Sequence, residues 1–373
     1  MSCTRFFFAG GGTGGHIYPA IAVAEKLAEL HPRAKVHFFV SSRDIDSQIL
    51  SKTGFEYTAL PAVGFSARAD RLLAFAGCFL KSYRTARAVI AADEKAVVVG
   101  VGGFVAAPVC FAGHRLGVPV VLINVDIVPG KANRIIARWA KEIFVQFSET
   151  AEYFGKRKSK VNVVGCPLRP AFSNPRPQQA IEKLGLDEHK KILLITGASS
   201  GSASINRTIC SLLSELAAFA DQWQIVHLTG RAQFEAVKAD YAGAAIDVKL
   251  LDYFDDMADL LAAAELVIGR SGAVSVAEYA AAGCPAICMP YPHHKDMHQY
   301  LNAGKLVEAG AAIIVDDVPD EKERREWLWE ELAALLCDDG KRAEMKKAYE
   351  KIANKDTASN IAGRLIEIAG QSQ

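Results

Sequence analysis

The sequence predicts an α/β protein built from two doubly wound parallel sheets. Three observations lead to this class: short apolar runs alternate with longer helical patterns, the alternation restarts after a proline-rich stretch, and several runs lead into loops of small residues. Apolar strands separated by helices are typical of parallel sheets that are covered on both faces. The right-handed crossover rule then makes each sheet doubly wound.

The composition suits a large folded protein. The chain has 373 residues, of which 50% are hydrophobic and 23% are charged, so two or three domains of ordinary size are expected. The formal net charge is only +1. Because so small a charge gives no global field toward nucleic acid, no nucleic-acid partner is expected.

The first half of the chain supplies one set of alternating elements. The expected strands are residues 5–9, 35–40, 96–101, 119–123, 142–145 and 161–164. The expected helices are residues 19–30, 44–52, 69–92, 105–116 and 131–140. Residues 5–9 lead into a glycine loop rather than a cleavage site, so they predict a buried strand and not a signal peptide.

A proline-rich segment separates this set from a second one. Residues 166–177 contain four prolines, which excludes a continuous helix or a central strand and predicts a linker. The strands expected after it are residues 191–196, 224–228, 248–251, 266–269, 286–290 and 311–315. The helices expected there are residues 204–218, 256–263, 274–282 and 299–309, followed by a helical tail from residue 321.

These two sets predict two domains. Residues 1–166 form the first and residues 167–349 the second, and a last helix at about 350–373 is expected to pack back on the first domain. Ligands of open parallel sheets bind beyond the carboxyl ends of the strands. Two such sheets facing each other would place a cleft between those ends, and the site is expected in that cleft.

The loop after the first strand is the first candidate site. Residues 10–15 include five glycines, and His16 follows them. Glycines let backbone amides approach a ligand closely, and the helix start behind them favours negative charge. The spacing lacks a clean G-x-G-x-x-G with an acidic ribose binder, and no Lys-Ser/Thr follows. Neither a dinucleotide loop nor a Walker A loop is therefore favoured.

His16 lies where a side chain would face that ligand. An imidazole with a pKa near neutrality can take a proton from an attacking hydroxyl, which makes His16 a candidate general base. The alternative is a residue at the helix start that bonds to backbone, and the position alone leaves both open.

The second half repeats the order of strand, turn and helix at residues 269–278. Ser271 and Gly272 open the turn, and the amides that follow would point at an anion such as a diphosphate. Glu278 can accept hydrogen bonds from a ribose diol, or merely favour the helix dipole. Residues 197–202 form another small-residue loop after a strand, where phosphate or sugar contact competes with a plain turn and an N-cap serine.

Histidines gather in residues 290–302. His293, His294, Asp296 and His298 raise a metal hypothesis, but a polar loop that recognises sugar hydroxyls has the same composition, and we favour that interpretation. The eight cysteines include no C-x-x-C pair and predict buried thiols in a reducing compartment. No apolar run reaches the ~18 residues of a membrane-spanning helix, so a cytoplasmic protein is expected.

The motifs occur in an order that resembles the MurG family of glycosyltransferases. The matching segments are Gly-Gly-Thr-Gly-Gly-His at 11–16 with Pro19 and Ala20, Gly-Val-Gly-Gly-Phe at 100–104, Gly-Lys-Ala-Asn-Arg at 130–134, Arg-Ser-Gly-Ala at 270–273 with Glu278, and His-Lys-Asp at 294–296 with Gln299, Asn302 and Ala303. The resemblance runs from about residue 5 to residue 316. Its order and spacing are more specific than any single loop.

The resemblance implies the GT-B architecture and an inverting transfer of N-acetylglucosamine from UDP-N-acetylglucosamine to lipid I. The product is lipid II, a precursor of peptidoglycan. Neither a metal nor a cofactor is implied. Because lipid I is a lipid-linked diphosphate of the inner leaflet, the expected location is peripheral, on the cytoplasmic side of the cell membrane.

The resemblance also implies roles for individual residues. On the acceptor side it implies a loop of Thr13, Gly14 and Gly15 and the candidate base His16. It also implies that Arg169, at the end of the first domain, reaches the diphosphate and stabilises the leaving UDP. On the donor side it implies Ser199 near the phosphates, a backbone contact of Phe254 with the uracil, the helix start and ribose carboxylate at Ala273, Val274, Ser275, Val276, Ala277 and Glu278, and the sugar loop at His298 and Gln299.

Two positions depart from the family pattern. The family has a Glu-Gln-Asn triplet where this chain has Asn124, Val125 and Asp126, and it has an asparagine where this chain has Cys166. Asp126 can still accept a hydrogen bond or serve as an auxiliary base, whereas Val125 cannot replace a glutamine. The donor motifs are intact, and the identity of the acceptor stays open.

Residues 68–87 are the expected membrane contact. Their apolar members are Leu72, Leu73, Phe75, Ala76, Phe79 and Leu80, and the flanking basic members are Arg68, Arg71, Lys81, Arg84 and Arg87. Such a segment can lie in the interface with its basic residues on anionic headgroups. An ordinary helix that covers the sheet is the alternative, and the resemblance favours membrane contact.

Three rival functions remain open at this point. The first is a glycosyltransferase of the same architecture with another lipid or metabolite acceptor, which the changed segment 124–126 motivates. The second is a UDP-sugar epimerase, which would form product without an acceptor. The third is a UDP-sugar-binding protein without activity, which would release no UDP with any acceptor.

Overall fold

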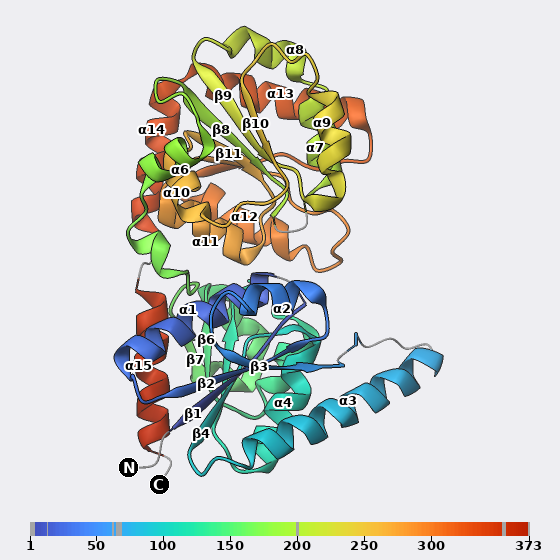
Figure 1. Ribbon diagram of the computed structural model, residues 1–373, viewed down its shortest axis with the longest axis vertical. Coiled ribbons are helices and arrows are strands. Elements are labelled where there is room, and N and C mark those ends of the chain that lie inside the picture. Colours follow the sequence, from blue (N-terminus) through green and yellow to red (C-terminus); the bar gives the residue numbers. More distant parts are fainter. Residues whose placement is uncertain are drawn as a thin grey trace. The chain divides into compact units, whose positions relative to one another are not determined.

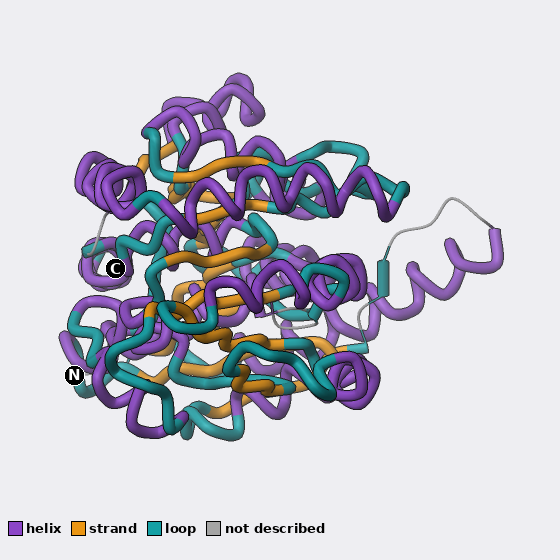
Figure 2. The backbone as a smooth tube through the Cα atoms, turned by 90° about the horizontal axis from the view of Figure 1, so that it is seen from above, coloured by secondary structure: helices purple, strands orange, loops and turns teal. Residues whose placement is uncertain are grey.

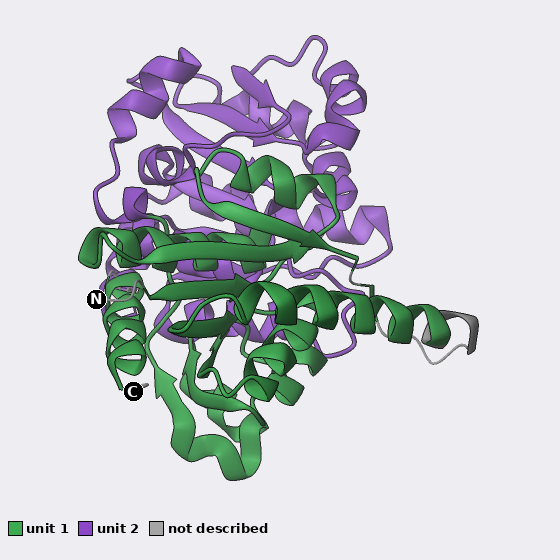
Figure 3. Cartoon of the chain, turned by 60° about the horizontal axis from the view of Figure 1, so that its bottom comes forward, with its two compact units in different colours: residues 1–169, 356–373 green, residues 170–355 purple. Residues whose placement is uncertain are grey.

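The chain forms two compact units, which Figure 3 distinguishes by colour. The structure, a computed structural model, describes residues 4–12, 14–61, 63–64, 69–198, 201–352 and 356–371. Unit 1 comprises Met1–Arg169 and Asp356–Gln373, and unit 2 comprises Pro170–Lys355. The division between the two halves thus falls between Arg169 and Pro170, three residues after the expected position, and the last helix belongs to unit 1.

Unit 1 is built around a parallel sheet, sheet A. In the described part of the chain this sheet has seven strands in the order β3-β2-β1-β4-β5-β6-β7. The strands are β1 (Arg5–Ala9), β2 (Lys35–Ser41), β3 (Glu56–Leu60), β4 (Ala96–Gly100), β5 (Val120–Asn124), β6 (Ala140–Val145) and β7 (Val161–Val163). The central strands β1, β4 and β5 are almost entirely apolar and, apart from Arg5, buried, because helices cover both faces of the sheet.

Helices flank sheet A (Figure 1). They are α1 (Gly14–Leu30), α2 (Asp44–Leu50), α3 (Ala69–Ile90), α4 (Gly103–Arg115), α5 (Lys131–Ile136), the 3₁₀ segment η1 (Ser148–Lys160) and α15 (Thr357–Gly370). Helix α3 packs against α4 at one end and projects from the body of unit 1 at the other (Figure 2).

The last helix completes unit 1 although it follows the whole of unit 2 in sequence. Helix α15 packs against α1, and its apolar stripe of Ile361, Leu365 and Ile368 is fully buried. Its first residue is tied by a 2.6 Å hydrogen bond from Thr357 Oγ1 to the carbonyl of Val164, and its middle by an ion pair between Arg364 and Glu142.

Unit 2 repeats the architecture. Within the described residues its sheet B has six parallel strands in the order β10-β9-β8-β11-β12-β13. They are β8 (Lys191–Thr196), β9 (Trp223–Leu228), β10 (Val248–Leu251), β11 (Leu266–Gly269), β12 (Ala286–Cys288) and β13 (Ala312–Ile314). The helices are α6 (Pro177–Leu184), α7 (Ala203–Cys210), α8 (Leu213–Leu216), α9 (Phe234–Asp240), α10 (Met257–Ala263), α11 (Ala273–Ala282), α12 (His298–Ala309), α13 (Glu321–Cys337) and α14 (Asp339–Ala348). Short 3₁₀ turns are η2 (Pro170–Ser173), η4 (Ala217–Phe219), η5 (Arg231–Gln233) and η6 (Tyr349–Lys351).

Each sheet has a topological switch point. In sheet A the strands β2 and β3 are added on one side of β1, and β4 to β7 are added on its other side. The switch point therefore lies between β1 and β4. In sheet B it lies between β8 and β11. Loops at the carboxyl ends of two strands diverge there and leave a crevice, which is where open α/β sheets bind ligands.

Among the strands and α-helices of the described residues, β3, α6 and α9 were not expected from the sequence, and neither was the 3₁₀ segment η1. Strand β3 is an edge strand with mostly exposed side chains, so it lacks the apolar run of its neighbours. Helix α6 begins at Pro177, the residue that was assigned to the end of the linker. A proline at the first helical position is tolerated, because its missing N–H has no partner within the helix in any case.

Helix α1 starts earlier than its expected position at residue 19. It begins at Gly14, so Pro19 lies inside the helix. Pro19 supplies no N–H for the carbonyl of Gly15, one turn before it. The glycine loop therefore runs directly into the first turn of α1, and Gly14, Gly15 and His16 are themselves helical residues.

No helix among the described residues is both long enough and apolar enough to cross a membrane. Seven cysteines lie in the described part of the chain, and all are free thiols. Cys110, Cys166, Cys284 and Cys288 are buried, as expected for small apolar side chains, whereas Cys337 is exposed.

Candidate functional site

The glycine loop after β1 is held in place by a buried carboxylate. Asp46 of α2 is fully buried and accepts hydrogen bonds from the amide of Gly12 at 2.9 and 3.0 Å, from the amide of Ser41 at 3.0 Å and from Ser41 Oγ at 2.5 Å. Arg43 donates to the carbonyl of Gly12 at 2.9 Å. A side chain at Gly11 would collide with the Asp46 carboxylate, which explains why glycine stands there.

A second glycine pair packs against this loop. Gly102 and Gly103 follow β4 with φ values of 126° and 77°, which other residues rarely adopt. A Cβ atom on Gly102 would lie 2.6 Å from Cδ2 and 2.9 Å from Nε2 of His16, and one on Gly103 would lie 2.5 Å from the carbonyl oxygen of Gly11. The imidazole of His16 thus lies against the backbone that follows β4, at the switch point of sheet A.

The segment after β5 borders the same group of residues. Asn124 is 2% exposed, donates from Nδ2 to the carbonyl of Asp126 at 2.6 Å, and accepts from Nδ2 of Asn133 at 2.8 Å. A Cβ atom on Gly102 would also lie 3.5 Å from Asn133 Nδ2. Asn124 therefore fixes the backbone that carries the half-buried Asp126, while Val125 points into the core at 4% exposure.

Arg169 lies beside the first turns of α1. Its guanidinium is 4.6 Å from the centre of the Tyr18 ring, and Tyr18 is two residues beyond His16. Burial raises the pKa of Glu25 on the same helix, and the positive charge of Arg169 partly offsets that rise. Unit 1 thus brings Gly14, Gly15, His16, Asp126 and Arg169 to the carboxyl edge of its sheet.

In unit 2 the first turn of α11 lies at the corresponding switch point. Gly272 is the N-cap residue of the helix and has no side chain that could bond to its first amides. These are the amides of Ala273, Val274 and Ser275. Val276 donates its amide to the carbonyl of Gly272 at 3.0 Å, and its side chain is 1% exposed. Ser275, Ala277 and Glu278 are half-buried, and these side chains are partly accessible at this helix start.

Two strained residues lie in the loops predicted to hold the donor. Among described residues other than glycine, only Ala198 and Met297 have positive φ values, 61° and 49°. Ala198 belongs to the loop after β8, and Met297 immediately precedes α12 and His298. Such backbone strain concentrates at functional sites, because the surrounding structure must hold it in place.

Other predicted donor residues are also located in unit 2. Phe254 is 7% exposed, and Lys183 Nζ lies 5.2 Å from its ring centre. Gln299 accepts from the amide of Tyr291 through Oε1 at 3.0 Å. His298 stacks on His294 at 4.3 Å between ring centres, and its Nδ1 is 2.7 Å from Asp296.

Some predicted residues lie outside the described part of the chain, namely Thr13, Ser199 and Arg68. The side chains of Arg71 and Leu72 also lie outside it. In the part of the chain that the structure describes, no group of three or more His, Cys, Asp and Glu side chains is arranged to hold a metal ion.

His227 is a further histidine of unit 2, and its surroundings indicate a structural role. It is fully buried, with Nδ1 2.8 Å from Tyr241 Oη and Nε2 3.0 Å from Asn206 Oδ1. Burial lowers the pKa of His227 to about 3, so the ring is neutral at physiological pH and no solvent reaches it.

Sequence reasoning missed the residues that hold these loops in place. From the sequence, no role is assigned to Asp46, and Arg270 is named only as part of a motif. Gly12 lies 34 residues from Asp46, and Asp317 lies 47 residues from Arg270. The one signal in the sequence that could have found these residues was a charged residue shortly after a predicted strand.

The chain matches two family models and several known proteins. The glycosyltransferase family 28 N-terminal domain matches residues 6–145, and the family 28 C-terminal domain matches residues 192–361. A UDP-N-acetylglucosamine–N-acetylmuramyl-(pentapeptide) pyrophosphoryl-undecaprenol N-acetylglucosamine transferase of Desulforudis audaxviator (strain MP104C) is 33% identical over 386 residues, covering 98% of this chain and 99% of its own length.

Two solved structures share the fold. MurG of Acinetobacter baumannii has a TM-score of 0.71 and 24% identity, with 98% of this chain and 99% of that chain covered. A UDP-GlcNAc 2-epimerase from Neisseria meningitidis bound to UDP-GlcNAc has a TM-score of 0.66 and 14% identity, with 99% and 100% covered. The architecture is therefore GT-B, with two Rossmann-like domains, as expected from the sequence. Since the Desulforudis relative is similar over the whole length, the chain belongs to the MurG family of UDP-N-acetylglucosamine-dependent glycosyltransferases.

Proposed function

We propose that this chain transfers N-acetylglucosamine from UDP-N-acetylglucosamine to lipid I, the N-acetylmuramyl-(pentapeptide) pyrophosphoryl-undecaprenol acceptor, and so forms lipid II for peptidoglycan. The observation that carries the proposal is the near-full-length similarity to a transferase with that activity in its name. The two switch points support it, because each carries a helix start built from small residues, as an anionic diphosphate requires.

The proposed step is an inverting displacement. A hydroxyl oxygen of the acceptor sugar forms a bond to the anomeric carbon while the bond from that carbon to the diphosphate breaks. UDP leaves with the electron pair, and the hydroxyl proton passes to His16. The close packing of His16 against Gly102 supports this role, because a base must be held in one orientation. Asp126 is the auxiliary candidate.

The diphosphate charge is assigned to the helix starts and to Arg169. The nucleotide of the donor is assigned to the loops of unit 2, including Phe254, Ala273 and Glu278. The sugar of the donor is assigned to Gln299 and His298. The lipid-linked diphosphate is assigned to Gly14 and Gly15 of unit 1, and the diphosphate of the leaving UDP to Arg169. Preorganised amides and an arginine stabilise a leaving diphosphate by several kcal/mol in favourable cases, roughly the scale known for oxyanion holes.

We also propose that the protein binds the cytoplasmic face of the membrane peripherally, through α3. Leu73 and Leu80 on this helix are 78% and 46% exposed, and Arg84 and Arg87 continue the same exposed stripe. Phe79 takes a different role, because its ring packs 6.4 Å from that of Phe111 on α4. An acceptor with a lipid tail favours an enzyme that reaches it at the bilayer surface.

A transferase with another lipid acceptor is the second candidate. It is favoured by Val125, which is buried where the family has a glutamine, and by Asn124, which bonds within the protein. Neither side chain can contact an acceptor directly, so the choice of acceptor would depend more on Asp126 than on the corresponding residue in other members of the family.

The deciding experiment measures UDP release and product formation from UDP-N-acetylglucosamine with lipid I, with other undecaprenyl diphosphate sugars, and without acceptor. The proposal expects lipid II and stoichiometric UDP only with lipid I. Product with another lipid alone would establish the second candidate, and an epimer formed without acceptor would establish an epimerase.

The role of His16 is tested in the same assay. His16→Ala is expected to lower kcat by about 10²- to 10⁴-fold, the range of general base catalysis, while the Kd of UDP stays unchanged. His189→Ala is the control, since that histidine is 87% exposed in unit 2. Unchanged turnover in His16→Ala would remove His16 from the mechanism.

A further inference from the structure

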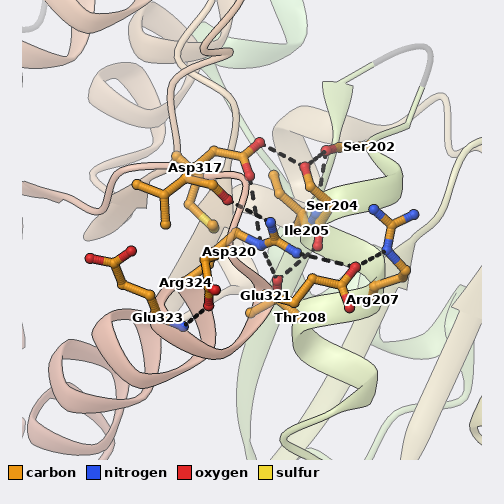
Figure 4. Close-up of polar contacts among 12 residues, drawn as sticks. Ser202, Ser204, Ile205, Arg207, Thr208, Asp317, Asp320, Glu321, Glu323 and Arg324 are labelled. Carbon is orange, nitrogen blue, oxygen red and sulfur yellow. Dashed lines mark hydrogen bonds and ion pairs between the residues drawn. The ribbon is translucent and has the colours of Figure 1, made fainter.

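A cluster of buried charges lies at the carboxyl edge of sheet B. Arg270, Asp317 and Arg324 are 7%, 7% and 3% exposed, and they come from the loop after β11, the loop after β13 and the start of α13. Figure 4 shows Asp317 and Arg324 beside side chains of α7 and its N-cap. Buried charges carry a large desolvation penalty, so each must be paired and hydrogen-bonded.

Arg270 uses both terminal nitrogens of its guanidinium within the protein. Nη2 donates to Ser202 Oγ at 2.8 Å, to Ser204 Oγ at 3.0 Å and to Asp317 Oδ2 at 2.7 Å. Nη1 donates to the carbonyls of Met289 at 2.8 Å and Pro290 at 3.2 Å. Two terminal nitrogens carry four hydrogens, and five acceptors already surround them. Arg270 therefore links segments of the protein to one another and does not act as a phosphate ligand.

The contacts of Arg270 extend across the switch point of sheet B. Arg270 follows β11, Ser202 follows β8 and caps α7, and Met289 and Pro290 follow β12. Helix α11 begins three residues after Arg270, so the first turns of α7 and α11 are held relative to each other by one side chain. Ala198, with its positive φ, belongs to the same loop as Ser202.

Asp317 in turn holds Arg270. Its Oδ2 accepts from Ser204 Oγ at 2.7 Å as well as from Arg270, and its Oδ1 is 3.7 Å from Arg324 Nε. Arg324 is fixed by donating to Thr208 Oγ1 at 2.8 Å and to the carbonyl of Val318 at 2.7 Å. Asp317 is thus the buried carboxylate that the two buried arginines share, while Arg324 also lies 3.8 Å from the exposed carboxylate of Glu321. Without Asp317, Arg270 would lose its carboxylate partner.

We propose that Asp317 is a positioning residue for the donor site: through Arg270 it keeps the loops after β8, β11 and β12 in the arrangement that binds the diphosphate of the nucleotide. The inference rests on the proposed function for the identity of the ligand. It assigns Asp317 no contact with substrate. The cluster keeps a net charge of plus one among its three buried groups, which also favours an anion at the adjacent helix starts.

The test compares Asp317→Asn with Asp316→Asn by measuring UDP affinity calorimetrically, without acceptor. Asp316 is the neighbouring residue and is exposed, so it matches the change in charge and chemistry. We expect Asp317→Asn to raise the Kd of UDP about tenfold, as is usual when a charge-assisted hydrogen bond is lost. Asp316→Asn is expected to bind like the wild type, and Asp317→Glu to recover part of the affinity.

A general loss of stability gives a different result. It raises the apparent Kd only by the reciprocal of the folded fraction, so a variant that circular dichroism shows to be almost fully folded should bind UDP like the wild type. In steady state the inference expects a raised KM for UDP-N-acetylglucosamine with an unchanged KM for the acceptor. If Asp317→Asn does not fold, Ser204→Ala removes a hydroxyl shared by Arg270 and Asp317 without leaving a charge unpaired, and it should weaken UDP binding severalfold.

Unchanged UDP affinity in Asp317→Asn, or equal weakening in Asp316→Asn, would overturn the inference. This outcome is separate from failure of the proposed function. If the wild type binds UDP but transfers nothing to lipid I, the proposed function fails while the comparison of UDP affinities still decides the role of Asp317.

Discussion

Asp46 shows how a single side chain shapes a loop that has almost no side chains of its own. Its carboxylate binds the amides of Gly12 and Ser41 in the fully buried interior of unit 1. A buried carboxylate is tolerated only with such donors, so the acid and the loop stabilise each other. Because the Gly12 amide is engaged with Asp46, the proposed function assigns the acceptor's diphosphate to the amides of the first turn of α1.

At this scale we predict the effect of Asp46→Asn. The amide group carries no charge and turns an N–H toward at least one backbone donor, so the loop should shift and stability should fall by about 1–3 kcal/mol. The KM for the acceptor should rise about tenfold, whereas the Kd of UDP, a property of unit 2, should stay the same. Asp44→Asn, two residues earlier and exposed, is the control. A normal acceptor KM in Asp46→Asn would show that the loop keeps its shape without the charge.

Helix α3 packs one side against α4, whereas its other side is exposed. Tyr83 packs 5.4 Å from Phe111 of α4, whereas Leu73, Leu80, Arg84 and Arg87 lie on the exposed side. Leu73 and Leu80 are seven residues apart, so they share a stripe of the helix. Arg84 and Arg87 follow the two leucines on the same stripe, and basic side chains beside apolar ones are typical of helices that bind an anionic bilayer surface.

The double substitution Leu73→Ser and Leu80→Ser tests this element. Binding to vesicles that contain phosphatidylglycerol should weaken about 10- to 100-fold, since each leucine buried in the interface contributes roughly 1–2 kcal/mol. Co-sedimentation at several salt concentrations measures it. Leu30→Ser on α1 is the matched control, because Leu30 is 52% exposed on another element of unit 1. Equal binding of the double variant and the control would exclude α3 as the contact.

At the scale of the whole molecule, the chain leaves unit 1 at Arg169 and returns to it at Asp356. Helix α15 covers α1, the helix whose first turn carries His16. Its buried stripe has the spacing i, i+4, i+7 that an amphipathic helix needs for one contact face. The folding of unit 1 therefore depends on the last residues of the sequence.

We predict that Leu365→Ala lowers the free energy of unfolding of unit 1 by about 2–5 kcal/mol, because it leaves a cavity under α15. Urea unfolding followed by circular dichroism measures the change. Asn360→Ala on the exposed face of the same helix should leave the midpoint nearly unchanged. UDP binding should survive in Leu365→Ala, since unit 2 does not include α15. A midpoint equal to that of the wild type would mean that α15 adds little to unit 1.

Much of the fold could be predicted from local patterns. The central strands are continuous apolar runs, and the glycine loops that follow β1 and β4 mark the switch point of sheet A. Strand β3 could not be found in this way, because an edge strand carries exposed polar residues. The start of α1 was misplaced because glycines argue against a helix, and only the packing of the loop decides that they form its first turn.

The sequence by itself determined the parallel sheets, the position of the small-residue loops and the family, because periodicity and short motifs are encoded in neighbouring residues. Only the tertiary structure decided what holds those loops in place. Gly12 and Asp46 are 34 residues apart, and Arg270 and Asp317 are 47 apart. Such pairs leave no local pattern, since their contact exists only after the strands between them are ordered in the sheet. The predicted donor and acceptor residues come from motifs, whereas the buried charges beside them are seen only in the fold.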